Sequence, residues 1–181
     1  MLTWTGLRWE KKTEDWIDPV QGIITSSCGV RENPILHKEE IHDGLDIAVA
    51  EGTDVLAVKS GTVTEVRTSA TYGKVLKYET EDGYEIMYAH LSEVLVKKGE
   101  EIKQGQVVAK SGNTGLSTGP HLHYGIYKNG ELLDPMDFVT LGWTDGVRAE
   151  YKARGGSIIK ENDAKPAFFG YDYKMKGRDA L

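Results

Sequence analysis

Two short turn sequences restrict the fold of this chain most, because each lies between apolar segments that alternate as strands do. Glu81-Asp82-Gly83 interrupts such a pattern within residues 74–88, and Asn129-Gly130 interrupts another within 125–133. Asp-Gly and Asn-Gly pairs accept the positive φ angles of tight hairpin turns. The sequence therefore predicts two antiparallel β-hairpins.

The amino-acid composition favours the same class of fold. The 181 residues are 39% apolar, which suits one domain with a sizeable core, and 21 glycines stand against five prolines. Frequent Val, Ile, Tyr and Thr favour short strands joined by glycine turns over a helical bundle. We expect an all-β, mainly antiparallel fold, packed as a compact sandwich or barrel-like domain.

A weak internal repeat links residues 49–63 with residues 96–107. Each segment contains a turn glycine, a short apolar strand and a second glycine turn. Lipoyl and biotinyl carrier domains have the same rhythm, but the carrier lysine motif of those domains is absent here. The repeat therefore predicts hammerhead-like repeated hairpins without indicating a function.

The pattern along the chain divides it into three parts. Residues 22–141 read as one continuous β domain, preceded by an irregular extension, 1–21, and followed by another, 142–181. The second extension carries eight Lys or Arg against six acids, so it is +2 while the remainder is −8. Its aromatic residues, among them Phe168 and Tyr171, lead us to expect that it packs back on the domain or mediates contacts.

Charge and cysteine content exclude some classes of function. The net charge of −6 provides no basic patch to neutralise phosphates, which argues against a nucleic-acid partner. The lone Cys28 cannot form an internal disulfide, and this leaves both reducing and oxidising compartments open. We find no apolar run for a transmembrane segment or for a signal-peptide core, so a protein acting outside the cell would need an export segment absent from this chain or another route. The oligomeric state is not indicated.

His121-Leu122-His123 offers two imidazoles at strand spacing. Residues two apart in a strand share a face and lie roughly 6.6 Å apart, so both imidazoles can point into one cleft while Leu122 and Tyr124 point away. An isolated His-x-His pair is also common on the surface of β proteins. The pair alone does not establish a site.

His42 and Asp46 add an imidazole and a carboxylate. A straight strand would separate them by roughly 13 Å, too far for two ligands of one ion at about 2.0 to 2.2 Å each. Gly44 offers a bend, and the alternation of Leu45 and Ile47 indicates a strand after it. We expect His42 in a turn and Asp46 on the strand that follows.

His90 lies in a third apolar segment, 86–91. Alternation places His90 on one face with Ile86 and Tyr88, and Leu91 on the other face with Met87 and Ala89. A buried structural histidine is the alternative interpretation. Four of the five histidines fall in segments that could face one cleft, and His37 is the expected bystander.

Three segments, 42–48, 88–92 and 111–123, carry a resemblance to a known family. The third, which ends in Thr118-Gly119-Pro120-His121-Leu122-His123, is very specific. In these segments the chain resembles the lysostaphin and LytM-type zinc endopeptidases of bacterial peptidoglycan, over about residues 25–138. Such proteins act as hydrolases of the cell wall, so the resemblance implies a metallopeptidase located in the cell envelope or outside the cell, with peptidoglycan stem or bridge peptides as partners.

Matched residue by residue, the resemblance implies one Zn²⁺ per chain, held by His42, Asp46 and His123. His90 and His121 are then catalytic histidines outside the ligand set. Three protein ligands leave a tetrahedral position for water or a substrate carbonyl, as a catalytic zinc requires. His121 could take the proton of the water, with His90 stabilising the developing charge or sharing that role. The division between them stays open.

The loop 112–120 is rich in glycine, but no Gly-Lys-Ser/Thr of a phosphate-binding loop follows it. We interpret it as a wall of the substrate groove, opposite a wall that contains Tyr72. The residues of the loop expected to hydrogen-bond a peptide backbone are Asn113, Thr114, Ser117 and Thr118.

Two other functions compete with a zinc endopeptidase. One is a catalytically inactive LytM-type domain that acts as a binding or scaffold module of the cell envelope. The other is a cysteine peptidase built on Cys28, which lacks the helix start that activates a nucleophilic thiol. Within the zinc peptidase, glycyl-glycine and D-alanyl-diaminopimelate bonds are both possible targets.

Overall fold

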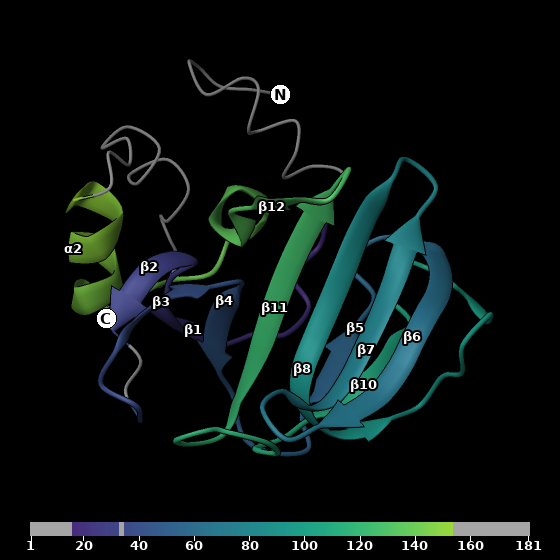
Figure 1. Cartoon of the computed structure of the whole chain (residues 1–181). Coiled ribbons are helices and arrows are strands. Elements are labelled where there is room, and N and C mark those ends of the chain that lie inside the picture. The colour runs from purple at the N-terminus through teal and green to yellow at the C-terminus, as the bar shows by residue number, and fades with distance from the viewer. Residues whose placement is uncertain (1–15, 33–34, 154–181) are drawn as a thin grey trace.

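Strands dominate the computed structural model, which describes residues 16–32 and 35–153 (Figure 1). The larger sheet contains β1 (Ile23–Ser26), β4 (Leu45–Ala48), β5 (Asp54–Leu56), β6 (Gly61–Ser69), β7 (Gly73–Thr80), β8 (Tyr84–Val94), β9 (Glu101–Ile102), β10 (Val107–Ser111), β11 (His121–Lys128) and β12 (Glu131–Leu133). A second, two-stranded sheet pairs β2 (Gly29–Glu32) with β3 (Glu39–His42). The helical elements are a short 3₁₀ helix, η2 (Pro135–Phe138), and α2 (Asp145–Ala153).

The strand pairs of the described residues are antiparallel, as expected for the predicted fold class. The main sheet runs in the order β1-β4-β11-β8-β7-β6-β9, and it is not closed into a barrel. The end of β8 also pairs with β10, which in turn pairs with β5. The mainly antiparallel all-β prediction is confirmed.

Both predicted hairpins are present. β7 and β8 are joined through residues 81–83, where Gly83 has a φ of 90°. β11 and β12 are joined by Asn129 and Gly130, with φ angles of 52° and 79°. Positive φ at both central residues matches the twist of the flanking strands, which is why this dipeptide fixes the register.

Strands from the two copies of the sequence repeat pair with each other. β5 and the start of β6 come from the first copy, whereas β9 and the first residue of β10 come from the second. β5 pairs with β10 while β6 pairs with β9, so each copy completes the sheet of the other. Neither copy would bury its apolar face alone.

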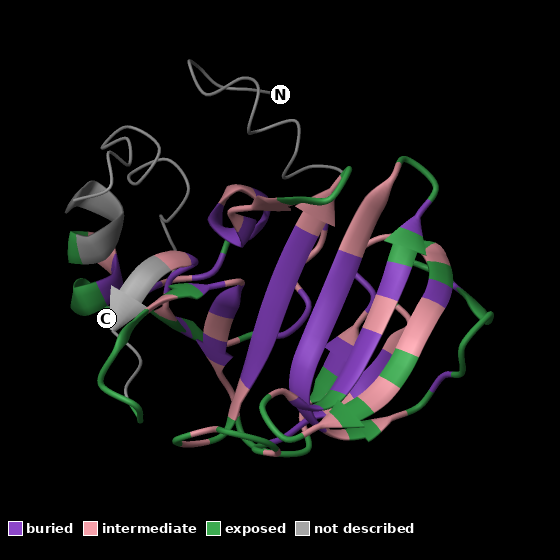
Figure 2. Ribbon diagram, viewed as in Figure 1, coloured by how far each residue is buried: buried purple, intermediate pink, exposed green. Residues whose placement is uncertain are grey.

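The main core packs against β8 and β11, the two central strands of the sheet. Figure 2 shows β11 and the middle of β8 as almost continuously buried, while β6 at the far side alternates with exposed residues. Trp16 contacts Phe138 at 4.5 Å between ring centroids and Tyr84 at 4.9 Å. These aromatic contacts close one end of the core.

The extensions contribute to this core. Trp16 and Val20 of segment 1–21, together with Trp143 and Val147 of segment 142–181, belong to the main buried cluster. Helix α2 lies within the extension 142–181, so the expectation that this extension is irregular was wrong for residues 145–153. Phe168 and Tyr171 lie outside the described residues, and the three-part division stays a prediction. Among the described helices, none has the length and apolar character required to cross a membrane.

Candidate metal centre

Strand β11 brings His121 and His123 to one face of the sheet. Leu122 and Tyr124 are fully buried in the main core, so the two histidines between and before them project to the opposite side. β11 pairs with β4 in a register that sets His123 directly opposite Asp46. The predicted orientation of the His-x-His pair is what the structure shows.

A sharp bend brings His42 and Asp46 together. His42 ends β3, Asp43 and Gly44 form the link, and Asp46 lies on β4, so the expected position of His42 within the turn is off by one residue. A Cβ atom on Gly44 would stand 2.7 Å from Nε2 of His123 and 2.7 Å from the Tyr124 carbonyl oxygen. Only glycine leaves space for the bend beside the His123 ring.

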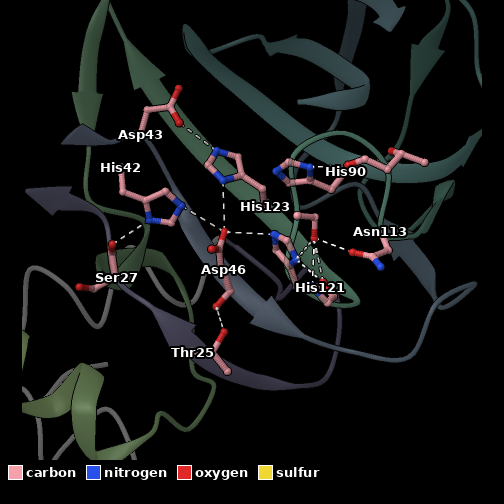
Figure 3. Close-up of polar contacts among 12 residues, drawn as sticks. Thr25, Ser27, His42, Asp43, Asp46, His90, Asn113, His121 and His123 are labelled. Atoms are coloured by element: carbon pink, nitrogen blue, oxygen red, sulfur yellow. Dashed lines mark hydrogen bonds and ion pairs between the residues drawn. The ribbon is translucent and has the colours of Figure 1, made fainter. Parts of the chain in front are cut away.

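Three side chains converge in the way a zinc ion requires. Nε2 of His42 and Nδ1 of His123 each lie 3.2 Å from Oδ1 of Asp46, and one ligand atom from each residue lies within 4.8 Å of the others. Ligands about 2.1 Å from a tetrahedral ion are roughly 3.4 Å apart. Figure 3 shows these imidazoles arranged around the Asp46 carboxylate. The donor set fits zinc in number, kind and spacing.

Backbone contacts select the nitrogen that His42 presents. Nδ1 of His42 lies 2.9 Å from the Ser27 carbonyl oxygen, which can only accept a hydrogen bond. Nδ1 therefore carries the proton and donates, and Nε2 keeps its lone pair toward Asp46. This is the arrangement that a metal-binding imidazole needs.

Charge within the cluster is strongly coupled. Burial acts to raise the pKa of Asp46, but the contacts with His123 and His42 outweigh it and hold that pKa well below its usual range. Burial acts in the opposite direction on His123, and the carboxylates of Asp43 and Asp46 outweigh it and raise the pKa of His123 to about 9. Without a bound cation, a proton on His123 balances the two carboxylates, so metal binding releases a proton.

His90 reaches the cluster by a route that alternation did not predict. Its φ is 58°, and the pairing of β8 with β7 shifts register between Tyr88 and Leu91. Leu91 consequently joins Ile86 and Tyr88 in the main core, while the His90 side chain turns to the face of Ala89. The predicted face of His90 was wrong because a β-bulge breaks the period of two.

The bulge sets His90 beside His121. Their ring centroids are 4.8 Å apart, and Nδ1 of His90 donates to the Thr114 carbonyl oxygen at 2.7 Å. Burial, together with His121 and His123 nearby, lowers the pKa of His90 to about 4, against the opposing effect of the Thr114 contact. His90 is therefore neutral at physiological pH, with its Nε2 lone pair available.

His121 is held by the same loop. Its Nδ1 lies 2.8 Å from the Gly119 carbonyl oxygen and 3.2 Å from Oγ of Ser117. In the neutral form, donation to the carbonyl leaves a lone pair on Nε2, which lies 3.6 Å from Oδ1 of Asp46. In that tautomer the nitrogen that faces the ligand cluster is the one free to accept a proton.

A cavity of about 690 Å³ opens over the cluster. Tyr72, Ser117 and Thr118 line it, as predicted for groove residues, whereas Asn113 and Thr114 do not. Thr114 instead donates its hydroxyl to the Leu91 carbonyl oxygen at 2.7 Å, and Asn113 accepts a hydrogen bond from Ser117. These two residues hold the loop in place, away from the cavity surface. His37 is exposed and does not line the cavity.

Two residues near the cluster were not predicted from the sequence: Asp43, which contacts His123, and Tyr127, which contacts Asp43. Oδ1 of Asp43 lies 3.1 Å from Nε2 of His123, and the hydroxyl of Tyr127 donates to Oδ2 of Asp43 at 3.2 Å. Tyr72 donates to the same oxygen at 2.6 Å. Asp43 was visible beside His42, but nothing in a linear pattern indicates that it contacts a residue 80 positions later.

The fold thus carries a candidate metal centre of two histidines and one aspartate. Residues 40–135, more than half of the chain, match peptidase family M23. The chain belongs to this family, which confirms the resemblance drawn from the three motifs.

Curated relatives match over part of their length. The DD-carboxypeptidase/endopeptidase Mpg of Neisseria meningitidis serogroup B is 39% identical over 113 residues, which cover 62% of this chain and 26% of that protein. Stage II sporulation protein Q of Bacillus subtilis is 39% identical over 126 residues, covering 67% of this chain and 44% of that protein. The matched region of the Neisseria protein is thus about a quarter of its length.

Solved structures agree in fold. A zinc-containing peptidase from Vibrio cholerae has a TM-score of 0.57 and 31% identity, covering 66% of this chain and 39% of that one. The catalytic domain of lysostaphin from Staphylococcus simulans has a TM-score of 0.58 and 33% identity, covering 64% of this chain and 90% of that one. Both are similar to the β domain that carries the metal centre.

Proposed function

We propose that this chain is a zinc-dependent endopeptidase that hydrolyses peptide crosslinks of bacterial peptidoglycan. The observation that carries the proposal is the complete donor set of His42, Asp46 and His123, with two further histidines beside it that are not needed as ligands. One zinc ion per chain, when bound there, would supply a Lewis acid for the scissile carbonyl and lower the pKa of a coordinated water.

The chain's own side chains supply the proton transfers. His121 presents Nε2 toward Asp46 while Gly119 and Ser117 hold its other nitrogen, so it suits the role of general base and then acid to the leaving amine. Neutral His90 stands 4.8 Å from it, ring to ring, and suits stabilisation of the developing charge or a shared proton transfer.

The walls of the cavity support a peptide substrate. Tyr72, Ser117 and Thr118 all line the cavity, and the Leu116 N–H donates to the Thr71 carbonyl oxygen at 2.8 Å, so their two loops form one continuous wall for an extended chain. The Neisseria relative is named a DD-carboxypeptidase/endopeptidase, which supports peptidoglycan peptides as substrates and the cell envelope or the exterior as the location. In this proposal Asn113 and Thr114 support the loop, and Ser117 and Thr118 face the substrate.

A catalytically inactive binding or scaffold module of the envelope is the second candidate. The observation in its favour is the match to stage II sporulation protein Q, a relative named for sporulation and not for hydrolysis. Against it stands the donor set, which is complete in this chain.

Digestion of purified peptidoglycan tests the proposal and separates the two candidates. The chain is incubated with cell walls containing glycyl-glycine bridges and with walls containing D-alanyl-diaminopimelate crosslinks, and released termini are sequenced. New termini from one wall type, lost on chelation and restored by Zn²⁺, are expected. Stoichiometric zinc without new termini from either wall type would favour the scaffold module. Thiol alkylation is expected to leave hydrolysis unchanged, which excludes Cys28 as nucleophile.

A further inference from the structure

Asp43 lines the cavity beside the candidate metal ligands, and the proposed chemistry gives it no role. Its carboxylate contacts one ligand, His123, and accepts hydrogen bonds from two tyrosines, Tyr72 and Tyr127. The three partners come from β11 and from the loop between β6 and β7. The tertiary fold therefore brings partners from distant parts of the chain to the Asp43 carboxylate.

The two nitrogens of His123 face different carboxylates. Nδ1 lies 3.2 Å from Asp46 and Nε2 lies 3.1 Å from Asp43, while only 3% of the side chain is exposed. A neutral imidazole carries one proton, and the nitrogen that binds a metal must be free of it. Zinc on Nδ1 therefore requires the proton on Nε2, the nitrogen that lies 3.1 Å from Oδ1 of Asp43.

Removal of Asp43 would take away the carboxylate that lies beside the Nε2–H of His123. The side chain is buried, so water cannot take the place of the carboxylate without rearrangement. The ring could relieve this only by moving its proton to Nδ1 or by rotating. Either change takes the lone pair away from the ion.

Asp43 is itself held in place by the hydroxyl groups of Tyr72 and Tyr127. The Tyr72 hydroxyl donates to it at 2.6 Å, and the Tyr72 carbonyl accepts the backbone N–H of His90 at 2.8 Å. Tyr72 thus connects the carboxylate behind His123 with the bulge that positions His90. The Tyr127 hydroxyl adds a second, longer bond at 3.2 Å.

We propose that Asp43 is a positioning residue, which fixes the Nε2–H form of His123 and so presents Nδ1 to the zinc ion. Tyr72 and Tyr127 orient the Asp43 carboxylate for this role. The inference rests on the proposed function, because it assumes that zinc binds to His123.

Zinc affinity of the purified chain tests this directly. Competition with a chromophoric chelator is measured at fixed pH for the parent chain and for Asp43→Ala, Asp43→Asn and Tyr127→Phe. Loss of an outer hydrogen-bond partner of a metal-binding histidine weakens binding by about 10- to 100-fold, which is the expected effect of Asp43→Ala. Asp43→Asn keeps an oxygen acceptor and is expected to recover part of the affinity, and Tyr127→Phe is expected to lose less than Asp43→Ala.

Asp54→Ala is the matched control. Asp54 is an exposed carboxylate on β5 that pairs with Lys110, so its removal changes the net charge equally without touching the cluster. Its zinc affinity is expected to equal that of the parent. If Asp43→Ala equals this control, the positioning role is wrong.

The imidazole N–H proton of His123 supplies an independent readout in the zinc-loaded protein. We expect a downfield, slowly exchanging signal in the parent, an upfield shift of that signal in Asp43→Asn, and its loss by exchange in Asp43→Ala. Unchanged signals in both variants would overturn the proposal, and if Asp43→Ala fails to fold, Asp43→Asn and Tyr127→Phe still decide it. A parent chain that binds no zinc at all contradicts the proposed function, whereas a parent that binds zinc as tightly as its Asp43 variants contradicts only this inference.

Discussion

The proposed metal ligands and the proposed catalytic histidines are held by different means. Asp46 and His123 are cross-strand partners in a fully hydrogen-bonded ladder, so the sheet itself sets their separation. His90 and His121 take their ring orientation from two carbonyl oxygens of the loop 112–120, those of Thr114 and Gly119. We therefore expect zinc binding to depend on the sheet, and proton transfer to depend on the loop 112–120. Changes directed at each region can separate the two functions.

The largest effect is expected from Asp46→Ala. The carboxylate is the point where both imidazole ligands meet, at 3.2 Å each, so its loss removes a ligand and the charge that balances the ion. We expect zinc affinity to fall by more than about 100-fold, the upper range for partners outside the ligand set, and hydrolysis to disappear. Metal analysis after gel filtration measures this, with Asp54→Ala as the control. Stoichiometric zinc in Asp46→Ala would remove Asp46 from the ligand set.

Replacing the catalytic histidines should separate turnover from metal binding. For His121→Ala and His90→Ala we expect hydrolysis to fall by about 10²- to 10⁴-fold, the usual contribution of general acid–base catalysis, with zinc content unchanged. The released amines are counted over time against the parent chain. His37→Ala changes an exposed histidine outside the cavity and serves as the control. Full turnover in either cavity variant excludes a catalytic role for that histidine.

Two glycine substitutions compare the link before β4, which positions the ligands of the sheet, with the loop 112–120. Gly44→Ala places a Cβ 2.7 Å from Nε2 of His123, so we expect zinc affinity to fall by about 10- to 100-fold. Gly115→Ala places a Cβ 2.3 Å from the Gly73 nitrogen at a φ of 78°, which displaces the loop behind Thr114. There we expect zinc to be retained and turnover to fall on the order of 100-fold, as for small displacements of catalytic groups.

Chelator competition and hydrolysis are measured on both glycine variants. Equal losses of zinc and turnover in the two would show that sheet and loop act as one unit. Gly52→Ala is a useful reference for positive φ, because its Cβ would have nothing within 4 Å.

The smallest expected effect is a pH dependence from His90. Its pKa in the folded chain is about 4, below the ordinary value of 6.5, so the unfolded chain takes up this proton first as the pH falls. Folding stability should therefore decrease from about pH 6.5 to about pH 4 and gain nothing from His90 above that window. Imidazole chemical shifts report the pKa, and denaturant unfolding reports the slope. In His90→Ala the part of the slope due to this histidine should vanish, and a His90 that titrates near 6.5 would contradict the burial argument.

Short sequence patterns were enough to predict the hairpins and the residues that meet at the candidate site. Asn129-Gly130 predicted its hairpin because positive φ at two successive residues has few other uses. The direction of His121 and His123 followed from alternation with Leu122 and Tyr124, and Gly44 correctly marked the bend. These features depend on a few neighbouring residues, so a linear sequence contains them.

Features that depend on tertiary contacts were not predictable in this way. The bulge at His90 leaves no mark in the alternation of segment 86–91, because its cause is the register against β7 and the bond to Tyr72. Asp43 needs partners 29 and 84 positions away in sequence, and the proton positions on the rings depend on carbonyl groups from other loops. Of the residues of helix α2 whose burial is described, Val147 is the one in the main core. One buried residue does not make a helical periodicity that could be recognised in the sequence.

Strand β11 alternates core and cluster residues, and this has a consequence for local unfolding. Leu122 and Tyr124, which flank His123, are fully buried, and β11 pairs with β4 on one side and with β8 on the other. His123 cannot leave the cluster by fraying, because β11 opens only when the central sheet opens. We therefore expect the backbone amides around His123 to exchange hydrogen at the rate of global unfolding, and the zinc site to persist as long as the protein is folded.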